Sequence, residues 1–256
     1  MKLKIQALCQ KGVVRDNNED MVSLGGILLR DDAMAFPIEL DEESQFDLLV
    51  ADGMGGHEHG ERASQELLTY LGTCFQDHLI SPEHPEDDLR RHVKQLSDRL
   101  NQEALDEGQR LPMGCTLTGM VWLHGKAFLV NAGDSRTYRL RDGILRRITQ
   151  DDTLRGISGD PNESKALLNC IGGGCQGELM VVDFSQRLLD NDTLLICSDG
   201  LTDLVSDDDI ETIMMTSPQP AADLYELACR NGGHDNVSII IAELSSATRQ
   251  AEDRQG

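Results

Sequence analysis

Residues 46–78 read FDLLVADGMGGHEHGERASQELLTYLGTCFQDH and pass from an apolar strand-like run, through a glycine-rich turn, into a helical stretch. The run LLVA before Asp52 is nearly all apolar, which indicates a strand that is buried on both faces. From about Glu58 to His78 the apolar residues recur at helical spacing. This stretch therefore predicts a strand and a helix that meet at an acidic turn.

Short strand-like runs dominate the rest of the chain. A second helical stretch, from about Glu86 to Glu107, follows SPEHPE, whose two prolines separate it from the first and predict a helical hairpin. Two more helices are predicted around DDDIETIMM, which opens on acidic residues, and PAADLYELACR. Helices among many antiparallel-looking strands predict an α+β layered domain. The predicted strands are KLKIQALC, FDLLVAD, CTLTGMVWL, KAFLVNAGD, TYRLRDGILRRI, TLLICSD and NVSIIIAEL.

Composition excludes several classes of protein. The net charge of −22, with no basic block, argues against partners such as nucleic acid or an anionic membrane. No apolar run approaches the ~18–20 residues that span a bilayer, and the first ten residues lack the pattern of a secretory signal. The seven cysteines form no CxxC pair, which predicts reduced thiols in a cytoplasmic protein.

The dipeptide Asp-Gly occurs three times, in two kinds of place. Asp142-Gly143 lies between two runs of alternating polarity, which predicts a hairpin turn and a structural aspartate. Asp52-Gly53 and Asp199-Gly200 each follow a nearly all-apolar run instead. A carboxylate at the end of a buried strand is partly desolvated, and it needs a cation or hydrogen bonds to stay ionised.

Further acids occupy similar positions. Asp134 ends the run FLVNAGD, Asp235 precedes the last apolar strand, and Glu19 and Asp20 close RDNNED. One aspartate at a strand end is more often a turn residue than a ligand, but five such sites, with glycine near four of them, favour a shared carboxylate site. Carboxylates, a backbone carbonyl and water are the ligands of Mg²⁺ or Mn²⁺.

Two such ions would allow the hydrolysis of a phosphate ester. Ions about 3.5–4 Å apart can lower the pKa of a bridging water and neutralise a phosphate during in-line attack. Arg15 lies four residues before Glu19, and its guanidinium could grip the phosphate, although a surface ion pair is the alternative explanation. The predicted activity is therefore metal-dependent phosphate ester hydrolysis.

The chain as a whole is predicted to form one domain over residues 1–245, because Glu19 and Asp235 must meet in space to build one centre. Residues 151–177, rich in Gly, Asp and Asn, are predicted to form an irregular excursion with a short helix near KALLNC. Residues 246–256 are predicted to form a flexible tail. The insertion GGILLRDDAMAFPIELDEESQ (25–45) is interpreted as an extended hairpin.

Seven segments of the chain, in this order, resemble the motif series of the metal-dependent protein phosphatases, the type 2C serine/threonine phosphatases, and above all their bacterial branch. The resemblance runs from about Val13 to Leu244. The segments are VVRDNNED, LLVADGMGGHEHGERAS, GCTLTGM, VNAGDSRTYRLRDG, LRRITQDDT, LLICSDGL and GGHDNVSIIIAEL. Each motif alone is common, but seven in one order indicate relationship rather than chance.

The resemblance implies a fold and a core metal site. The fold would be an α-β-β-α sandwich, in which two antiparallel sheets pack face to face between helical pairs, with 151–177 as a short flap. Asp52 matches the residue that bridges two metal ions, and Gly53 matches the backbone carbonyl ligand. Asp199 and Asp235 match the other carboxylates of the centre.

The resemblance also implies the remaining site residues. Glu19 matches the acid that reaches a metal through water, Asp134 matches a ligand of a third, weaker metal, and Arg15 matches the phosphate-binding arginine. The nucleophile would be a water or hydroxide bridged by the two ions. Relatives from eukaryotes carry a histidine where this chain has Met54, and neither His57 nor His59 is a clear replacement as the acid.

The implied substrates are phosphoserine and phosphothreonine in proteins, with a serine/threonine kinase and its targets as partners and a monomer as the expected state. Two alternatives stay open: a catalytically silent module of the same fold that docks a kinase or phosphoprotein, and a phosphatase of small phosphate esters.

Overall fold

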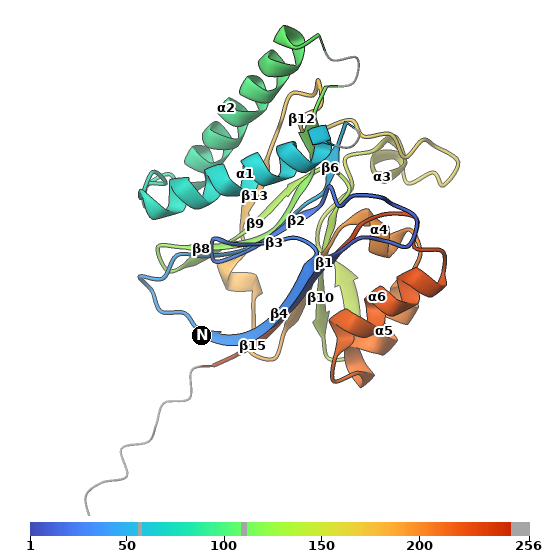
Figure 1. Cartoon of the computed structure of the whole chain (residues 1–256). Coiled ribbons are helices and arrows are strands. Elements are labelled where there is room, and N and C mark those ends of the chain that lie inside the picture. The colour runs from blue at the N-terminus through green and yellow to red at the C-terminus, as the bar shows by residue number, and fades with distance from the viewer. Residues whose placement is uncertain (56–57, 109–111, 247–256) are drawn as a thin grey trace, which may run out of the picture.

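Two six-stranded antiparallel sheets lie face to face in the computed structural model, which describes residues 1–55, 58–108 and 112–246 (Figure 1). In sheet order, the first contains β11 (Ile144–Arg147), β10 (Arg136–Arg141), β14 (Thr193–Cys197), β15 (Val237–Ser245), β1 (Lys2–Gln10) and β4 (Asp32–Glu39). The second contains β13 (Met180–Asp183), β9 (Lys126–Ala132), β8 (Leu117–Leu123), β5 (Phe46–Ala51), β2 (Met21–Leu24) and β3 (Ile27–Leu29).

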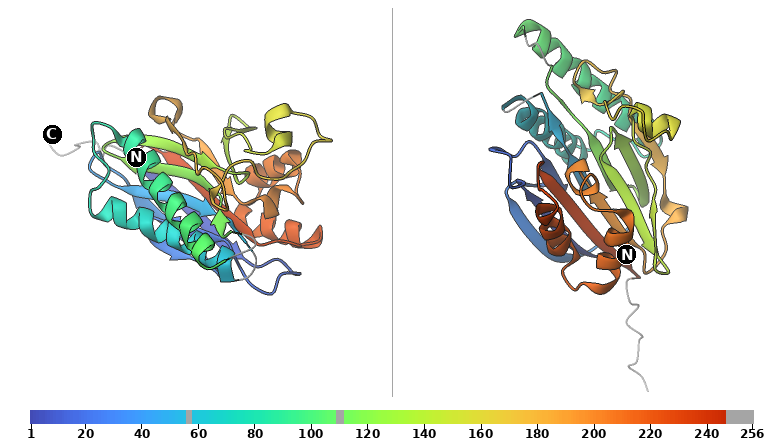
Figure 2. Two further views of the ribbon diagram at one scale, coloured as in Figure 1. Left: turned by 90° about the horizontal axis from the view of Figure 1, so that it is seen from above. Right: turned by 90° about the vertical axis from the view of Figure 1, so that its right-hand side faces the viewer.

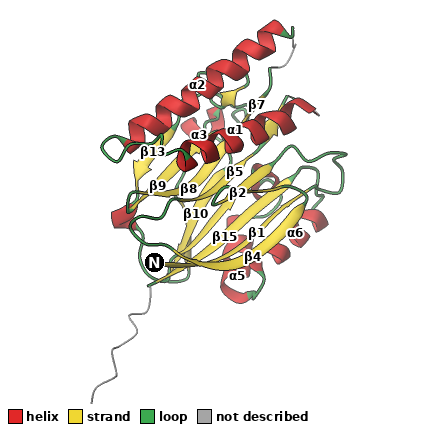
Figure 3. Ribbon diagram, turned by 60° about the vertical axis from the view of Figure 1, so that its left-hand side comes forward, coloured by secondary structure: helices red, strands yellow, loops and turns green. Residues whose placement is uncertain are grey.

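Helices cover the outer face of each sheet (Figures 1 and 3). The second sheet packs under α1 (Glu58–Gln76) and α2 (Pro85–Asp106). The first packs under α4 (Asp199–Thr202), α5 (Asp207–Thr216) and α6 (Pro220–Arg230). The predicted α-β-β-α sandwich is therefore confirmed.

The apolar runs of the sequence are strands with both faces buried. In β5, Leu48 and Val50 point into the core between the sheets, while Leu49 and Ala51 pack toward the α1 and α2 layer. In β1, Ile5 belongs to the core between the sheets and Leu8 to the core under α6. Side chains alternate across a strand, so a strand that separates two hydrophobic layers needs apolar residues at nearly every position.

A small third sheet joins the two-residue strands β12 (Ile171–Gly172), β7 (Gly114–Cys115) and β6 (Gly53–Met54). It ties the residue after Asp52 to the end of the excursion at 151–177. That excursion projects as a separate loop (Figure 2) and contains the short helix α3 (Leu154–Ser158). A single 3₁₀ turn, Ser185–Arg187, follows β13.

Two local predictions were wrong. The helix expected near KALLNC is absent from these described residues, because Leu167 pairs with Thr153 in an isolated β-bridge and the Leu168 N–H donates to the Asp152 carbonyl at 2.8 Å. The helix forms earlier, at α3, where the Thr153 side chain caps its first turn.

The insertion at 25–45 is not one self-paired hairpin. Its first strand, β3, pairs with β2 in one sheet, and its second, β4, pairs with β1 in the other. The insertion therefore links the two sheets and adds an edge strand to the first. By contrast, the Asp142-Gly143 turn joins β10 to β11 as predicted, and both residues have positive φ, 51° and 76°.

Two further findings bear on the earlier predictions. No helix in the described ranges is long and apolar enough to cross a membrane. The predicted tail lies, from residue 247 onward, outside the described residues.

Candidate metal centre

All seven residues predicted for the site line one cleft of about 550 Å³. They come from the first loop, the end of β5, the end of β9, the start of α4 and the loop before β15. The residues that line the cleft are Arg15, Glu19, Asp52, Gly53, Met54, Gly55, Thr116, Asp134, Lys165, Leu167, Asp199, Asp235 and Asn236. Tertiary folding thus gathers side chains that the sequence spreads over more than 200 positions.

Asp52 is held where β5 ends. Its N–H donates to Thr116 Oγ1 at 3.0 Å, and the Thr116 N–H donates back to the Asp52 carbonyl at 2.8 Å. Next to it, Gly53 leaves no room for a side chain, since a Cβ there would lie 2.2 Å from the Gly60 carbonyl oxygen and 2.5 Å from that of Glu19. The glycine therefore allows three backbone segments to meet beside the aspartate.

Asp199 is the first residue of α4 and is separated from the end of the buried strand β14 by Ser198 alone. The following Gly200 packs against the last motif, because a Cβ there would lie 1.9 Å from the Asn236 carbonyl oxygen. Asn236 also accepts a hydrogen bond from the Glu19 N–H at 2.9 Å and donates to the Asn17 carbonyl at 2.9 Å. This asparagine, which sequence reasoning passed over although it adjoins Asp235, joins both ends of the chain at the cleft.

Arg15 reaches across the cleft mouth to the last motif. Its Nη2 donates to Asp235 Oδ2 at 2.8 Å, and its Nε donates to the His234 carbonyl at 3.2 Å. The exposed fractions of the Arg15 and Asp235 side chains are 48% and 38%. Arg15 therefore forms an ion pair, which was the alternative to phosphate binding, but this pair lies inside the predicted site.

Glu19 and Asp20 point to different surroundings. Glu19 lines the cleft, and its backbone carbonyl accepts from Ser64 Oγ at 2.6 Å. Asp20 is buried beneath the cleft, where Asp20 Oδ2 accepts from Ser238 Oγ at 2.8 Å. Its other oxygen has no hydrogen-bond partner within the described residues.

Burial and the charges of neighbouring acids raise the pKa of several aspartates of this cluster. Burial raises the pKa of Asp134 to about 7, and the charge of Asp199 adds to the effect. Burial also raises the pKa of Asp20 to about 7. The pKa of Asp52 lies well above its ordinary value, through burial first and then the charges of Asp20 and Asp199. These three aspartates are therefore costly to ionise unless positive charge is added.

The donor set fits hard divalent cations. Asp52 and Asp199 both line the cleft, and burial raises the pKa of each, so an added cation would relieve two acids at once. Oxygen donors grouped with a neighbouring glycine backbone are the ligands that Mg²⁺ and Mn²⁺ prefer. Among the described residues no three acid, histidine or cysteine side chains already converge as a complete metal-binding group. The fit therefore rests on donor chemistry and on uncompensated charge.

The described residues that line the cleft include no histidine that could act as a general acid. Met54 lines the cleft at the position after Gly53, and a thioether carries no proton to donate. His59 is half-buried in α1 and is not one of the cleft-lining residues, and His57 lies outside the described residues.

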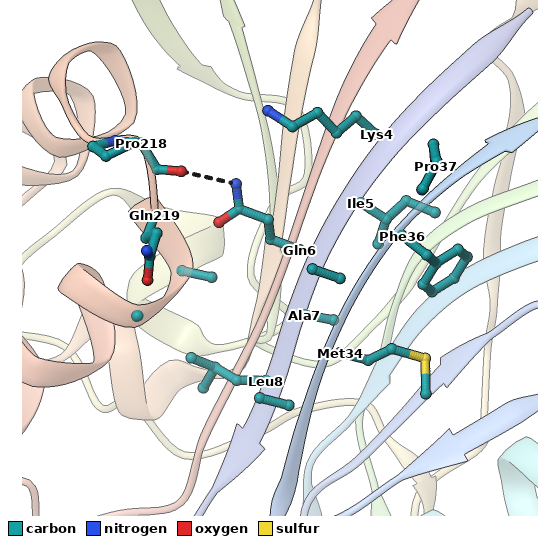
Figure 4. Close-up of a pocket in the computed structure, with 14 residues that line it drawn as sticks. Lys4, Ile5, Gln6, Ala7, Leu8, Met34, Phe36, Pro37, Pro218 and Gln219 are labelled. Atoms are coloured by element: carbon teal, nitrogen blue, oxygen red, sulfur yellow. Dashed lines mark hydrogen bonds between the residues drawn. The ribbon is translucent and has the colours of Figure 1, made fainter.

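A second hollow, of about 680 Å³, lies away from the acid cluster (Figure 4). Residues of β1 and β4 form one side of it, and the start of α6 with the segment before it forms the other, where Gln6 Nε2 donates to the Pro218 carbonyl at 3.3 Å. Its lining is mostly apolar and includes no carboxylate. The chemistry of phosphate hydrolysis therefore belongs to the acidic cleft.

Comparisons with known proteins agree with this choice. A family model described as Protein phosphatase 2C matches residues 26–226. The serine/threonine phosphatase stp of Listeria welshimeri is 29% identical over 249 residues, which cover 91% of this chain and 92% of that protein. The serine/threonine protein phosphatase PstP of Mycobacterium tuberculosis is 34% identical over 94% of this chain, which spans 45% of that longer protein.

Solved structures give the same picture. The catalytic domain of PstP, in complex with two manganese ions, superposes with a TM-score of 0.72 at 31% identity, over 95% of this chain and 100% of that one.

Proposed function

The chain belongs to the protein phosphatase 2C family, and on that premise we propose that it is a metal-dependent serine/threonine protein phosphatase. The observation that carries the proposal is the gathering of Arg15 and the predicted carboxylates in one cleft. Its substrates are phosphoserine and phosphothreonine in proteins that a serine/threonine kinase has modified. The relatives named serine/threonine phosphatases support this substrate class.

The residues that would hold two Mg²⁺ or Mn²⁺ ions are Asp52, the Gly53 carbonyl, Asp199 and Asp235, with Glu19 acting through water. Asp134 and Asp199 would hold a third, weaker ion. When bound, such ions supply positive charge for the phosphate and lower the pKa of the water that two of them share. The relative crystallised with two manganese ions supports this assignment.

The chain's own residues prepare the cleft for these partners. Burial raises the pKa of both Asp52 and Asp199, so protons compete with cations for these two carboxylates and metal loading depends on pH. A phosphate group in the cleft would compete with Asp235 for the guanidinium donors of Arg15. Met54 cannot protonate the leaving seryl oxygen, so that proton must come from water or another group.

Large apolar side chains are exposed on the two chain segments that contribute Arg15 and Lys165 to the cleft, and this favours a peptide over a small ester. Val13 and Val14, next to Arg15, are 67% and 64% exposed, and Ile157 and Leu168 on the excursion are 61% and 47% exposed. Exposed apolar side chains on segments that line a charged site are typical of surfaces that bind a protein chain. This observation favours protein substrates over the alternative of small phosphate esters.

We also propose one catalytic domain over residues 1–245, a flap at 151–177 and a monomeric state. The direct contact of Arg15 with Asp235, 220 positions apart, supports a single domain. The seven free thiols support a location in the cytoplasm.

The decisive experiment measures phosphate release from a phosphothreonine peptide, with Mn²⁺ and then with excess EDTA. We expect activity in wild type with Mn²⁺, none with EDTA, and a loss of at least about 100-fold in Asp52→Asn and Asp199→Asn, because the lost charge weakens cation binding. Circular dichroism should show that both variants stay folded, since neither side chain packs a hydrophobic core.

Asp142→Asn is the matched control, because it makes the same change in the third Asp-Gly dipeptide, at a hairpin turn outside the cleft. It should keep wild-type activity. Full activity in folded Asp199→Asn would refute the assignment. Metal binding without turnover of any phosphopeptide would point to the catalytically silent docking module. A strong preference for a small ester over phosphopeptides would instead favour a phosphatase of small phosphate esters.

A further inference from the structure

Lys165 brings a positive charge from the flap into the acidic cleft. Its Nζ donates to Asp203 Oδ1 at 2.5 Å, and Lys165 and Leu167 line the cleft together with the metal-site carboxylates. Of the described residues that line the cleft, Arg15 and Lys165 are the two with a cationic side chain. Lys165 has no place in the reaction as proposed above, so its position calls for a separate explanation.

The flap backbone holds this lysine at a defined place. On one side, the Arg155 N–H donates to the Ser164 carbonyl at 3.1 Å, and on the other, Leu167 pairs with Thr153. At the base of the flap, Asp151 accepts from Arg136 Nη2 at 2.7 Å and is itself buried. Lys165 therefore lies between two tied points of a short loop rather than at a free tip.

The two cations serve different parts of the cleft. Arg15 pairs directly with Asp235. Its positive charge is also stabilised by the nearby carboxylates of Glu19 and Asp52. Lys165 pairs with Asp203, and its positive charge favours the ionised form of the Asp199 carboxyl group. A phosphate held by Arg15 would therefore leave Lys165 free to meet a different group of the same substrate.

We propose that Lys165 is a specificity-determining residue that binds an acidic side chain next to the phosphorylated serine or threonine. This inference rests on the proposed function. The Lys165 and Asp203 side chains are 51% and 38% exposed, and ion pairs as exposed as this are weak, so a substrate carboxylate can replace Asp203 at little cost. In a chain of net charge −22, an acidic peptide needs such a local cation in order to bind.

The test compares two phosphothreonine peptides that differ only in glutamate or glutamine beside the phosphorylated residue, together with an aryl phosphate. Wild type should show kcat/KM about fivefold higher for the glutamate peptide, the size expected of one partly exposed ion pair. Lys165→Gln should abolish this preference through KM, Lys165→Arg should keep most of it, and the aryl phosphate should be hydrolysed equally by all.

Lys126→Gln is the matched control, because Lys126 is also 51% exposed and pairs with Asp183, a residue outside the cleft. It should behave as wild type. Equal peptide preference in wild type and Lys165→Gln would overturn the inference. An equal loss on both peptides and the aryl phosphate would also overturn it, since that pattern belongs to a residue that acts on the phosphate itself.

Binding of the two labelled peptides, measured by fluorescence anisotropy, separates this inference from the proposed function. If wild type hydrolysed none of the three substrates with Mn²⁺, the proposed function would fail. The role of Lys165 in binding would still be supported if wild type bound the glutamate peptide fivefold more tightly and Lys165→Gln removed this difference. Equal binding of both peptides to wild type would reject it.

Discussion

Buried carboxylates carry the chemistry of this protein and also its electrostatic strain. In the acid cluster, Asp20 and Asp134 both have a pKa of about 7, and burial is the main cause. Such groups destabilise a fold when they ionise without a partner. Their retention at the ends of buried strands is explained by a function that uses them.

Asp47 is a buried acid outside the cleft and gives a clean test of this cost. It lies in β5 with 2% of its surface exposed, and burial raises its pKa from 3.8 to about 6 although a Ser23 hydrogen bond opposes the shift. Between these two values the folded protein binds more protons than the unfolded chain, so stability falls as pH rises through that window.

Asp47→Asn should therefore raise the free energy of unfolding by roughly 1–2 kcal/mol above about pH 7, and by much less near pH 4, where wild type is protonated as well. Urea denaturation at both pH values measures this difference. The exposed Asp41, whose pKa is lowered by its Ser44 hydrogen bond, is the control. Asp41→Asn should show no gain at neutral pH, and a gain in Asp47→Asn that is equal at both pH values would contradict the explanation.

At the scale of elements, helix ends show how short polar signals set boundaries. Helix α5 begins after Ser206, whose Oγ accepts a hydrogen bond from the Asp209 N–H at 3.2 Å, and three aspartates fill its first turn. The cap satisfies an otherwise free N–H, and the acids oppose the positive end of the helix dipole.

Ser206→Ala should lower the free energy of unfolding by about 1 kcal/mol, because it removes the cap and leaves that N–H to water. Thr212→Ala in the same helix is the control, since Thr212 is exposed and alanine has the higher helix propensity. Denaturant titration of both variants should show a loss for Ser206→Ala and little change or a gain for Thr212→Ala. Equal losses would mean that the cap contributes nothing specific.

At the scale of the whole molecule, the site depends on pairings between distant segments. Strand β15 lies inside its sheet between β14 and β1, and the loop before it carries Asp235. A chain cut after Ser217 loses α6, β15 and that aspartate. It should show neither cooperative unfolding nor Mn²⁺ binding in a calorimetric titration.

A chain that ends at Ser246 is the matched control for this truncation, because it retains every described strand and should unfold cooperatively and bind Mn²⁺ as the full chain does. Metal binding by the shorter form would contradict the layout in which both ends build one centre.

The acid cluster also predicts how metal ions act on the entire fold. Mn²⁺ at about 100 times its Kd should raise Tm by roughly 5–10 °C, since binding to the folded state alone contributes about 2.7 kcal/mol. The rise should be smaller near pH 6 than near pH 8, because protons compete for acids such as Asp134, whose pKa is about 7. Scanning calorimetry with Mn²⁺ or EDTA measures it, and an equal rise in Asp199→Asn would place the ions elsewhere.

The sequence by itself determined the strands, the long helices and the kinds of residue at the site. Apolar runs such as LLVA and LLICS predict strands between two hydrophobic layers, because each face of the strand must be covered. The aspartates after these runs were predicted as ligands because an acid at the end of a buried strand needs compensation. These are local properties, because they depend on residues that are neighbours in the sequence and not on tertiary contacts.

Only the tertiary structure decided which segments meet. The ion pair of Arg15 with Asp235, the burial of Asp20 and the position of Lys165 depend on contacts between distant or irregular segments. The pairing of β4 with β1, and the helix that formed at α3 rather than near KALLNC, were likewise settled by neighbouring strands and loops. Periodicity shows which faces of an element are apolar, whereas the pairing of strands is settled only when the whole sandwich forms, since long-range pairing supplies the hydrogen-bond partners of the strand backbones.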